Sequence, residues 1–408
     1  MTYDFGIIGG GPAGYTVAMQ LAKSGKKVVL FEKEFLGGTC LNKGCIPTKS
    51  LLHSSEMYKK ILEADSLGFE LDIKSFDFSK IAEKRDKTIE KIRKSLELAV
   101  KNSGVEIVYS EAKIINNTTI SADKEYNVKK IILATGSKPR ELKGIEFDSK
   151  FILSSDDVLK LNKLPKSVLI VGSGAIGIEW ARIFSNFGAE VSIVEMAEHL
   201  IPLADIEISK RIERIFKQKK IKYYLGDSIS EIKENSVILT SGAIIEPEFV
   251  LSAVGRVPNK SFEGLELLGD VRGEIQLAHY AIQQAVNFAT DKSILIDKKL
   301  VPSVIYGEPE IAWVGLREQD CEGDCKTVML PITALGKSWC DDATEGFIKI
   351  IAKENKILGA HIVSKEASAL IQQILIAMQH NITVEELKQV CFAHPTFSEG
   401  IFEAICRL

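Results

Sequence analysis

The stretch Tyr3-Asp-Phe-Gly-Ile-Ile-Gly-Gly-Gly-Pro-Ala-Gly14 joins a short apolar strand directly to a glycine-rich turn. A helical pattern follows through Ala22. In the Gly-x-Gly-x-x-Gly register, Gly9 makes the turn, Gly11 lets the backbone approach a pyrophosphate, and Gly14 allows the helix to pack closely on the strand. This order of elements predicts a dinucleotide-binding fold rather than a glycine loop that serves only a turn.

The expected second strand of this fold, Lys27 to Phe31, ends in an acid, Glu32, placed to accept hydrogen bonds from a ribose hydroxyl. The same arrangement then occurs again. Ser167 to Gly177 is a strand with a glycine turn, Glu179 to Phe187 is its helix, and Glu190 to Glu195 is a second strand with a terminal acid. Two dinucleotide folds are therefore expected in one chain.

The second terminal acid bears on the choice of cofactor. Glu195 would bind the 2′-hydroxyl of NAD and repel the 2′-phosphate of NADP, and the following Met196 and Ala197 offer no arginine. We expect NAD(H) at the second fold. A solvated strand end is the alternative interpretation of Glu195.

Between the two folds, Gly37-Gly-Thr-Cys-Leu-Asn-Lys-Gly-Cys-Ile-Pro-Thr-Lys49 carries two cysteines, Cys40 and Cys45. On a regular helix their Cα atoms would lie roughly 8 Å apart, beyond the ~7 Å limit for a disulfide. The backbone between them must therefore be irregular, and Asn42 and Gly44 are expected to supply its permissive conformations.

Pro47 is tolerated only near the first turn of a helix, so a helix is expected to begin close to Cys45. That start would place the sulfur at the positive end of the helix dipole and favour its thiolate. The stretch predicts a redox-active disulfide, with two inert buried cysteines as the alternative and no second pair that indicates zinc. The other close pair, Cys321 and Cys325, lies in a polar segment and is interpreted as two surface residues.

Composition limits the possible classes of protein. The chain has 408 residues, 45% of them hydrophobic, which is enough for two or three domains with their own cores. The net charge of −3 predicts neither nucleic acid nor a membrane surface as a partner. No apolar run approaches the ~18 residues that span a bilayer, and the first strand leaves no room for a signal peptide. With seven cysteines, an odd count, these features predict a cytoplasmic protein with one catalytic disulfide.

Hydrophobic spacing predicts the remaining elements. They are a long amphipathic helix over 76–103, a buried strand over 130–136 that ends in Thr-Gly, a strand over 250–259 that opens into a loop, a helix over 275–289, an antiparallel meander over 345–363 and an apolar helix over 367–378. The part after the last loop carries no nucleotide signature. It is expected to be an α+β domain.

Near the C-terminus, Cys391-Phe-Ala-His-Pro-Thr-Phe-Ser-Glu-Gly400 contains a histidine and an acid that fit a general base and its orienting group. A thiol–disulfide enzyme needs such a base, because only the thiolate attacks. His394 could equally be a structural histidine, and Thr396 to Glu399 also fits a helix capping box. Spacing alone leaves both interpretations open.

In this order the motifs resemble those of the pyridine nucleotide–disulfide oxidoreductases. They are the first glycine loop, the Cys-Leu-Asn-Lys-Gly-Cys-Ile-Pro-Thr-Lys stretch, the second glycine loop, Gly255-Arg-Val-Pro-Asn259, Gly269-Asp-Val271 and His394-Pro-Thr-Phe-Ser-Glu399. The resemblance covers nearly the whole chain and is greatest to the class I enzymes that oxidise dihydrolipoyl groups. Glutathione reductases fit less well, since they typically carry arginines near the position of Glu195.

The resemblance implies FAD at the first fold and NAD at the second. The FAD contacts that it implies are Gly9, Gly11, Pro12, Ala13, Gly14, Glu32, Lys33, Gly38, Thr39, Lys49, Thr135, Gly136 and Asp270. The NAD contacts that it implies are Gly172, Gly174, Ile176, Gly177, Glu195 and Gly255. No metal site is expected.

The resemblance also implies the reaction. Electrons would pass from dihydrolipoyl thiols to a Cys40–Cys45 disulfide, then to flavin, and then as hydride to NAD. Cys45 would face the flavin and Cys40 would exchange with substrate. Lys49 and Glu179 would form an ion pair beside the flavin.

His394 and Glu399 match the acid–base pair that each subunit of the family lends to its neighbour, so a homodimer is implied. Lipoylated carrier proteins of 2-oxo acid dehydrogenase or glycine-cleavage complexes would be its partners. We therefore expect an α/β fold with two Rossmann-like domains and a C-terminal α+β dimerisation domain. The expected limits are 1–142 for the FAD domain, 143–258 for the NAD domain, 259–300 for a shortened central segment that completes the FAD domain, and 301–408 for the interface domain.

Two departures from the family stand out. Between Asn259 and Gly269 the family inserts some tens of residues, of which this chain keeps only 260–268. A short strand over 265–268 is expected to deliver Asp270 to the flavin, after a connector that reaches at most ~17 Å. If the short connector abolished FAD binding, a non-catalytic nucleotide-binding or scaffolding protein is the alternative function. Phe392 stands where relatives often carry a second histidine.

Overall fold

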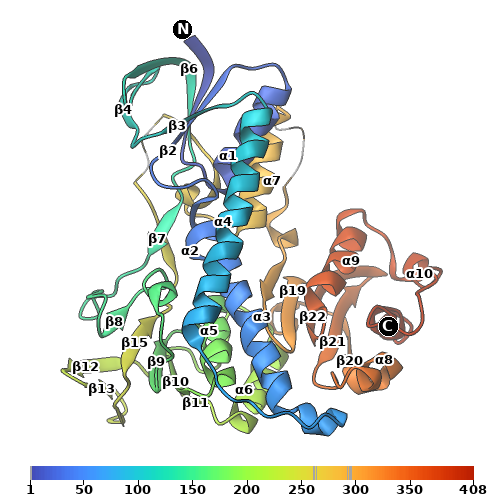
Figure 1. Ribbon diagram of the computed structural model, residues 1–408. Coiled ribbons are helices and arrows are strands. Elements are labelled where there is room, and N and C mark those ends of the chain that lie inside the picture. The colour runs from blue at the N-terminus through green and yellow to red at the C-terminus, as the bar shows by residue number, and fades with distance from the viewer. Residues whose placement is uncertain (1, 261, 263, 292, 294–295) are drawn as a thin grey trace.

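The computed structural model of the protein describes residues 2–260, 262, 264–291, 293 and 296–408 (Figure 1). Three large sheets, two of them largely parallel and one antiparallel, pack with helices, and a three-stranded and a two-stranded antiparallel sheet are smaller. The predicted α/β class with a C-terminal α+β part is confirmed. No helix within the described ranges has the length and apolar character needed to cross a membrane.

The first sheet combines a parallel centre with an antiparallel flank, in the order β3-β2-β1-β6-β5-β4, and β17 also pairs with β6. Because β1 lies between β2 and β6 and runs parallel to both, the glycine turn after β1 stands at the carboxyl edge of the sheet. The strands are β1 Thr2–Ile8, β2 Val28–Glu32, β3 Glu106–Tyr109, β4 Lys113–Asn116, β5 Thr119–Ser121, β6 Glu125–Leu133 and β17 Glu266–Leu267.

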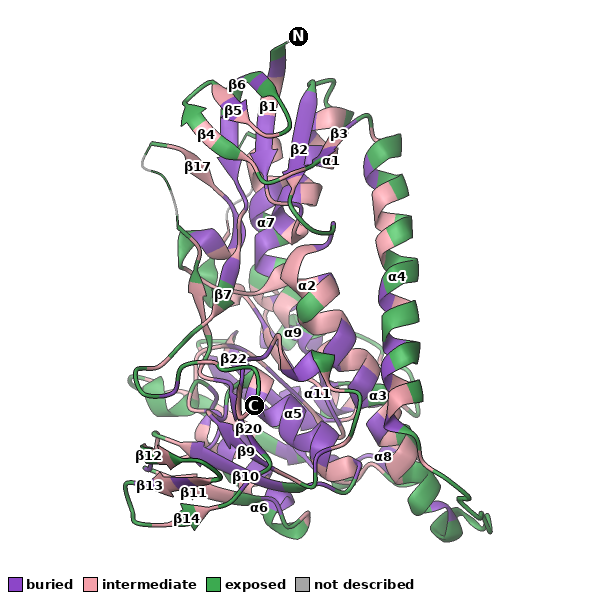
Figure 2. Ribbon diagram, turned by 60° about the vertical axis from the view of Figure 1, so that its left-hand side comes forward, coloured by how far each residue is buried: buried purple, intermediate pink, exposed green. Residues whose placement is uncertain are grey.

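Three long helices accompany this sheet: α1 Pro12–Lys23, α4 Phe78–Asn102 and α7 Ala278–Ala289. A Cβ at Gly14 would overlap the carbonyl oxygen of Gly9, so only glycine lets α1 pack this closely on the turn. Figure 2 shows α4 at the side of the molecule with exposed residues along its length, as expected for its charged face.

The cysteine stretch forms two helices, α2 Gly38–Lys43 and α3 Cys45–Leu62, that meet at Gly44. Gly44 has φ −151° and ψ −108°, which breaks the helical path between the two cysteines. The predicted irregular backbone and the predicted helix start at Cys45 are both confirmed.

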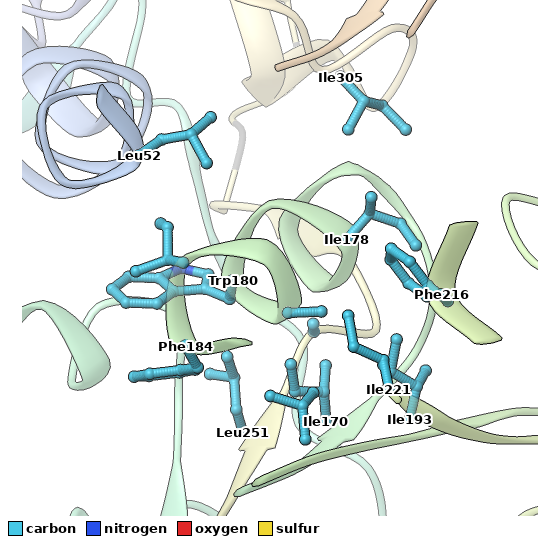
Figure 3. Packing of buried hydrophobic residues seen from close by; sticks show 14 of the residues in the cluster. Leu52, Ile170, Ile178, Trp180, Phe184, Ile193, Phe216, Ile221, Leu251 and Ile305 are labelled. Carbon is cyan, nitrogen blue, oxygen red and sulfur yellow. The ribbon is translucent and has the colours of Figure 1, made fainter. Parts of the chain in front are cut away.

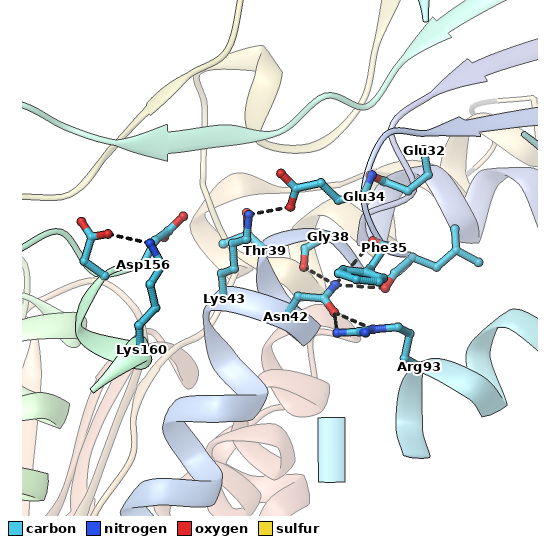
Figure 4. Close-up of polar contacts among 12 residues, drawn as sticks. Glu32, Glu34, Phe35, Gly38, Thr39, Asn42, Lys43, Arg93, Asp156 and Lys160 are labelled. Atoms are coloured by element: carbon cyan, nitrogen blue, oxygen red, sulfur yellow. Dashed lines mark hydrogen bonds and ion pairs between the residues drawn. The ribbon is translucent and has the colours of Figure 1, made fainter. Parts of the chain in front are cut away.

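The prediction for Asn42 was wrong, because this residue lies inside α2 and does not supply a special backbone conformation. Its side-chain amide instead donates to the carbonyls of Leu36 (3.0 Å) and Gly38 (2.9 Å). Arg93 of α4 donates to the Asn42 oxygen at 3.0 and 2.9 Å (Figure 4). Asn42 therefore ties the cysteine stretch to the long helix.

The second sheet is parallel throughout, in the order β11-β10-β9-β15-β8. Helix α5 follows its glycine turn and begins at Ala175, earlier than the predicted Glu179, because Gly174 already serves as the N-cap. The elements of this part are β7 Ser137–Pro139, β8 Ile152–Leu153, β9 Ser167–Val171, α5 Ala175–Asn186, β10 Glu190–Glu195, α6 Ile206–Gln218, β11 Lys222–Leu225, β12 Ile229–Lys233, β13 Ser236–Leu239, β14 Ile244–Ile245, β15 Phe249–Ser252 and β16 Arg256–Pro258.

Helix α5 is the centre of the largest apolar core (Figure 3). Every residue from Gly177 to Phe184 is buried, because α3 covers α5 on one side and the second sheet covers it on the other. Trp180 and Phe184 stack at 5.1 Å between ring centroids, and Leu52 of α3 packs in the same cluster. The core therefore fixes α3, and with it Cys45, against the second sheet.

The C-terminal sheet is antiparallel, in the order β18-β19-β22-β21-β20, and α9 packs on β22 and β19. Glu354 and Asn355 have positive φ, which confirms the predicted turn of the meander. The elements are β18 Ser303–Ile305, β19 Glu310–Gly315, β20 Lys326–Pro331, α8 Gly336–Cys340, β21 Phe347–Lys353, β22 Lys356–Ser364, α9 Ala367–Gln379, α10 Val384–Leu387 and α11 Glu399–Ile405.

Short 3₁₀ helices complete the chain: η1 Ala64–Leu67, η2 Val158–Lys160, η3 Gly269–Arg272, η4 Lys298–Leu300, η5 Glu318–Asp320 and η6 Ile332–Ala334. Beyond η5, Cys321 and Cys325 form a disulfide with Cα atoms 6.5 Å apart. Their interpretation as two separate surface residues was incomplete, because the polar loop between them brings the two sulfurs together.

The shortened connector keeps its predicted strand. Glu266 and Leu267 form β17, parallel to Ile132 and Leu133 of β6. Within the rest of the connector, residues 261 and 263 lie outside the described residues. The strand ends directly before η3, which carries Asp270.

A largely buried ion cluster joins the antiparallel sheet to the start of α6. The ammonium of Lys349 on β21 lies 2.7 Å from Asp205 and 2.5 Å from Glu318, and the side chains of Lys349 and Asp205 are 1% and 0% exposed. Asp205 also caps α6 through the amide of Glu207. Loss of one partner would leave a buried charge without compensation.

We therefore expect Lys349→Met to lower the free energy of unfolding by about 3 kcal/mol, because Asp205 keeps its buried charge. Adding Asp205→Asn should recover part of that loss. Chemical denaturation followed by tryptophan fluorescence measures both. Lys365→Met, which removes a 40% exposed lysine whose partner Asp341 keeps Lys337 at 2.8 Å, is the control and should cost less than about 0.5 kcal/mol. Equal stability of the Lys349 and Lys365 variants would contradict the prediction.

Candidate functional site

A large cleft brings together the cysteine stretch and the second glycine turn. Among the residues that line it are Cys40, Cys45, Lys49 and Glu179, which come from α2, α3 and α5. The packing of α3 on α5 therefore places both cysteines and Lys49 beside an acid, Glu179, that is far from them in sequence.

The two cysteines are free thiols in this structure and differ in acidity. The hydrogen bond from Cys40 lowers the pKa of Cys45 to about 7, although burial opposes the shift, and the nearby Lys49 acts in the same direction as the hydrogen bond. The same hydrogen bond, together with burial, raises the pKa of Cys40. Cys45, at the first position of α3, is therefore the thiolate and Cys40 the thiol.

The predicted partners Lys49 and Glu179 form an ion pair. The ammonium of Lys49 donates to both carboxylate oxygens of Glu179 at 2.8 Å, with the two side chains 31% and 5% exposed. The ring of Tyr306 lies under the same ammonium, 4.7 Å from nitrogen to ring centroid. Burial lowers the pKa of Lys49, but the field of Glu179 more than offsets it, so the pKa is raised and the ammonium stays charged.

The first glycine turn fits the pyrophosphate and ribose of a dinucleotide. Helix α1 begins there without a side-chain cap, so its first amides are free to bind an anion. Both oxygens of Glu32 accept backbone hydrogen bonds, from Gly10 and Glu34 at 2.8 Å, which hold the carboxylate beside the turn. The hydroxyl of Thr135, at the end of β6, is buried without a hydrogen-bond partner in the described part of the chain. These donors suit FAD.

The short connector does place Asp270 in this region. Gly269 has φ 78°, packs against Ala13 and Ala281, and donates to the side chain of Gln284 at 2.8 Å. Asp270 then accepts from the hydroxyl of Ser137 at 2.6 Å. The charge of Asp270 is among the causes that raise the pKa of Cys40, after its hydrogen bond to Cys45 and burial.

The second glycine turn lines the cleft and fits NAD. Helix α5 begins after Gly174 without a side-chain cap, which leaves its first amides open to phosphate. One oxygen of Glu195 accepts from the amide and hydroxyl of Ser173, at 2.8 and 2.7 Å, and the other accepts from Ala197. The acid is thus held beside the turn, where it disfavours a 2′-phosphate.

The predicted cofactor residues fall into two groups. Those that line the cleft are Thr39, Cys40, Cys45, Lys49, Gly172, Gly174, Ile176, Glu179, Glu195 and Gly255. Those that the structure places away from its lining are Gly9, Gly11, Pro12, Ala13, Gly14, Glu32, Lys33, Gly38, Thr135, Gly136, Asp270 and Gly177. Most of the second group surrounds the first glycine turn, and Gly177 instead packs α5 on the turn before it.

His394 and Glu399 form a pair at the opposite end of the chain. Nδ1 of His394 lies 2.7 Å from Glu399, whose second oxygen accepts from the amide of Thr396 at 2.8 Å. These hydrogen bonds hold the pKa of Glu399 below its ordinary value although burial opposes them. Glu399 therefore orients the histidine, whereas the predicted capping box is not formed: α11 begins at Glu399 after Ser398, and the Thr396 hydroxyl donates to the carbonyl of Ala393. Only the contact from the Thr396 amide to Glu399 is present.

The imidazole of His394 is 77% exposed, and neither His394 nor Glu399 lines the cleft of its own chain. With Nδ1 engaged by the carboxylate, Nε2 is left available for proton transfer. His394 is therefore oriented by Glu399 but set apart from the thiols of its own chain.

Three residues near the site escaped the sequence analysis. Arg256 donates to the hydroxyl (2.9 Å) and carbonyl (2.8 Å) of Ser137, and Asn259 donates to the carbonyl of Thr135 at 2.7 Å. Tyr306 lies under Lys49. Arg256 and Asn259 belong to a recognised motif and could have been suspected, whereas nothing in the spacing indicated Tyr306.

Comparison with known proteins is consistent across sequence and structure. Residues 3–283 match the family described as "pyridine nucleotide-disulphide oxidoreductase", and residues 301–405 match that family's dimerisation domain. A dihydrolipoyl dehydrogenase of Bacillus subtilis is 34% identical over 459 residues, with 98% of this chain and 97% of the relative covered. Leghemoglobin reductase of Vigna unguiculata is 32% identical over 452 residues, with 98% and 86% covered.

Solved structures agree with this likeness. LpdA of Mycobacterium tuberculosis superposes with a TM-score of 0.92 at 25% identity, and 99% of each chain is covered. The HOCl-induced flavoprotein disulfide reductase RclA of Escherichia coli superposes with a TM-score of 0.87 at 25% identity, also with 99% of each chain covered. The chain is therefore similar along its whole length to flavoprotein disulfide reductases.

The geometry of the cysteines predicts a titration that can be measured. In the reduced protein the Cys45 thiolate should be present above about pH 7 and lost below it, because Cys40 donates a hydrogen bond to it. Cys40→Ala removes that donor, so the midpoint should rise towards about 8.5 and alkylation of Cys45 at pH 7 should slow about tenfold. Rates of iodoacetamide labelling, resolved by peptide mass spectrometry, test this. Cys406→Ala, an exposed cysteine, is the control, and an unshifted midpoint in Cys40→Ala would refute the assignment.

Proposed function

Because the chain belongs to the pyridine nucleotide–disulphide oxidoreductases, which use FAD and NAD, we propose that it oxidises dihydrolipoyl groups through Cys40 and Cys45 with NAD as the final acceptor. The single observation that carries the proposal is the placement of Cys40 and Cys45 in one cleft, with Cys45 at the first residue of α3 and the Lys49–Glu179 ion pair in the lining of the same cleft. When bound, FAD would supply the two-electron chemistry that connects the dithiol to NAD.

The protein's own residues divide the thiol–disulfide step between them. His394 of the partner subunit takes the proton of one dihydrolipoyl thiol, and the resulting thiolate attacks Cys40 of the disulfide. The Cys40–Cys45 bond breaks and Cys45 leaves as the thiolate, because the sulfur with the lower pKa is the better leaving group. The second dihydrolipoyl thiol then attacks the first substrate sulfur, which is bonded to Cys40. This bond breaks, the substrate disulfide forms, and Cys40 leaves and takes the proton of the second thiol.

The step is balanced. Two substrate thiols become one substrate disulfide, and the protein disulfide becomes one thiol and one thiolate. The two protons reside on Cys40 and His394. Glu399 keeps the imidazole in the tautomer that accepts at Nε2 and stabilises the imidazolium that forms.

We propose lipoyl groups on carrier proteins as the substrate, on the strength of the dihydrolipoyl dehydrogenase relatives and the open cleft beside the thiols. A dithiol centre that cycles between reduced and oxidised forms fits the reducing cytoplasm. The non-catalytic alternative gains no support, since β17 still brings Asp270 to the first sheet and every predicted catalytic side chain is present.

We expect the purified protein to show the absorbance of bound FAD and to reduce NAD with dihydrolipoamide. Cys45→Ser should keep the FAD absorbance but lose this reaction, because no disulfide can form. Visible spectra and NADH production measure the two effects. Persistent NADH production by Cys45→Ser, or a protein that stays colourless after incubation with FAD, would overturn the proposal.

The shared site can be tested with mixed dimers. A dimer of one Cys45→Ser chain and one His394→Ala chain, isolated with two affinity tags, should recover about half of the original activity, since one of its two sites is complete. Each variant alone should be inactive. Lack of recovery in the mixed dimer would show that His394 acts on its own chain, and a His394→Ala protein that keeps its activity would show that His394 does not act at all.

A further inference from the structure

Tyr306 contacts both residues of the Lys49–Glu179 ion pair. The Tyr306 ring lies under the ammonium of Lys49, 4.7 Å from nitrogen to centroid. The backbone amide of Tyr306 donates to the Glu179 oxygen at 3.1 Å. One residue therefore contacts both members of the pair, the cation through its ring and the anion through its main chain.

Arg182 fixes the main chain of this tyrosine. Its guanidinium is 1% exposed and donates to the carbonyl of Tyr306 at 2.9 Å. The guanidinium also packs against Gly307, where any Cβ would overlap it and where φ is 133°. Arg182 lies one helical turn after Glu179 on α5, so the same helix that carries the anion also anchors the segment that donates to it.

The ring of Tyr306 and the ammonium of Lys49 attract each other through a cation–π interaction. A cation over an aromatic face within about 6 Å is attracted by the ring, more strongly where water is excluded. Tyr306 lines the same cleft as Cys45 and Lys49 and is partly buried there. Without the ring, the ammonium would keep Glu179 but could move away from the sulfur.

We propose that Tyr306 is a positioning residue of the thiol–disulfide centre: it holds the Lys49–Glu179 pair so that the ammonium faces Cys45. The charged and titratable groups around Cys45 are Cys40 from α2, Lys49 from its own helix, Glu179 from α5 and Tyr306 itself. Of these, Lys49 is the cation whose position Tyr306 controls. This inference deepens the proposed function and rests on its assignment of the thiolate to Cys45.

The consequence is that the dimerisation domain takes part in the chemistry of its own chain as well as of its partner. Tyr306 follows β18 within the region that matches the family's dimerisation domain. Ile305, the last residue of β18, is buried in the α5 core. The ring is therefore placed by the docking of the C-terminal domain on α5.

The test compares Tyr306→Leu with Tyr306→Phe in the full-length holoenzyme after reduction with dithiothreitol. The phenylalanine ring and the backbone amide both remain in Tyr306→Phe, so the pH midpoint for alkylation of Cys45 should equal that of the original protein. Tyr306→Leu keeps only the amide, and Cys45 alkylation at pH 7 should slow about threefold as the midpoint rises. Iodoacetamide labelling with peptide mass spectrometry gives both values, and thermal unfolding confirms that the variants are folded.

Lys49→Met tells whether the ring acts through the ammonium. In that background, Tyr306→Leu should change the midpoint no further, whereas a ring with only a packing role would give the same shift with or without Lys49. If Lys49→Met does not fold, the comparison of Tyr306→Leu with Tyr306→Phe decides alone. Equal midpoints for those two variants would overturn the role of Tyr306.

The outcomes separate this inference from the proposed function. Cys45→Ser identifies the reactive thiol, since its labelled peptide should disappear. If the reactive thiolate proves to be another cysteine, the proposed function loses its nucleophile and the inference falls with it. If Cys45 is the thiolate and the ring has no effect, only the inference fails.

Discussion

The ion pair between Lys49 and Glu179 is the contact on which the arrangement of the centre depends. Lys49 belongs to the helix that begins at Cys45, and Glu179 to the most buried helix of the second parallel unit. With Glu179 only 5% exposed, removing Lys49 would leave a nearly buried carboxylate without its cation, at a cost of about 3–5 kcal/mol. The pair therefore fixes the angle at which the cysteine helix meets the second sheet, as well as the field at the sulfur.

This field explains how two adjacent cysteines acquire different roles. Cys45 has the helix N-terminus, the ammonium and a thiol donor around it, all of which favour a negative sulfur. Cys40 donates its own proton and is partly buried, and the charge of Asp270 also favours the neutral thiol. The difference in pKa between the two cysteines is produced by residues from α2, α3 and η3. It therefore exists only when η3, which is distant in sequence, has packed beside the cysteine stretch.

The sequence predicted those features of the fold that depend on the backbone conformations of neighbouring residues. The glycine turns, the strands before them and the helix start at Cys45 follow from backbone conformations that few residues adopt, and the meander turn follows from Glu354 and Asn355. The Lys49–Glu179 pair was expected only from the family resemblance. Other contacts between distant segments escaped prediction, because spacing carries no signal for them. Examples are Tyr306 under Lys49, the Asp205 and Lys349 pair, and Asn42, whose value lies in its side chain rather than its backbone.

The short connector still brings the chain to Asp270 along the end of the first sheet. What the site needs from this region is the direction in which the chain arrives at Asp270, and two residues of β17 set it by pairing in parallel with the end of β6. Gly269 then fits between Ala13 and Ala281 at a positive φ, so α1 and α7 clamp the turn from both sides. Since pairing and clamping involve only residues that this chain retains, the residues lost between the two domains were not those that place the carboxylate. A site that depends on the end of one strand is therefore insensitive to the length of chain before that strand.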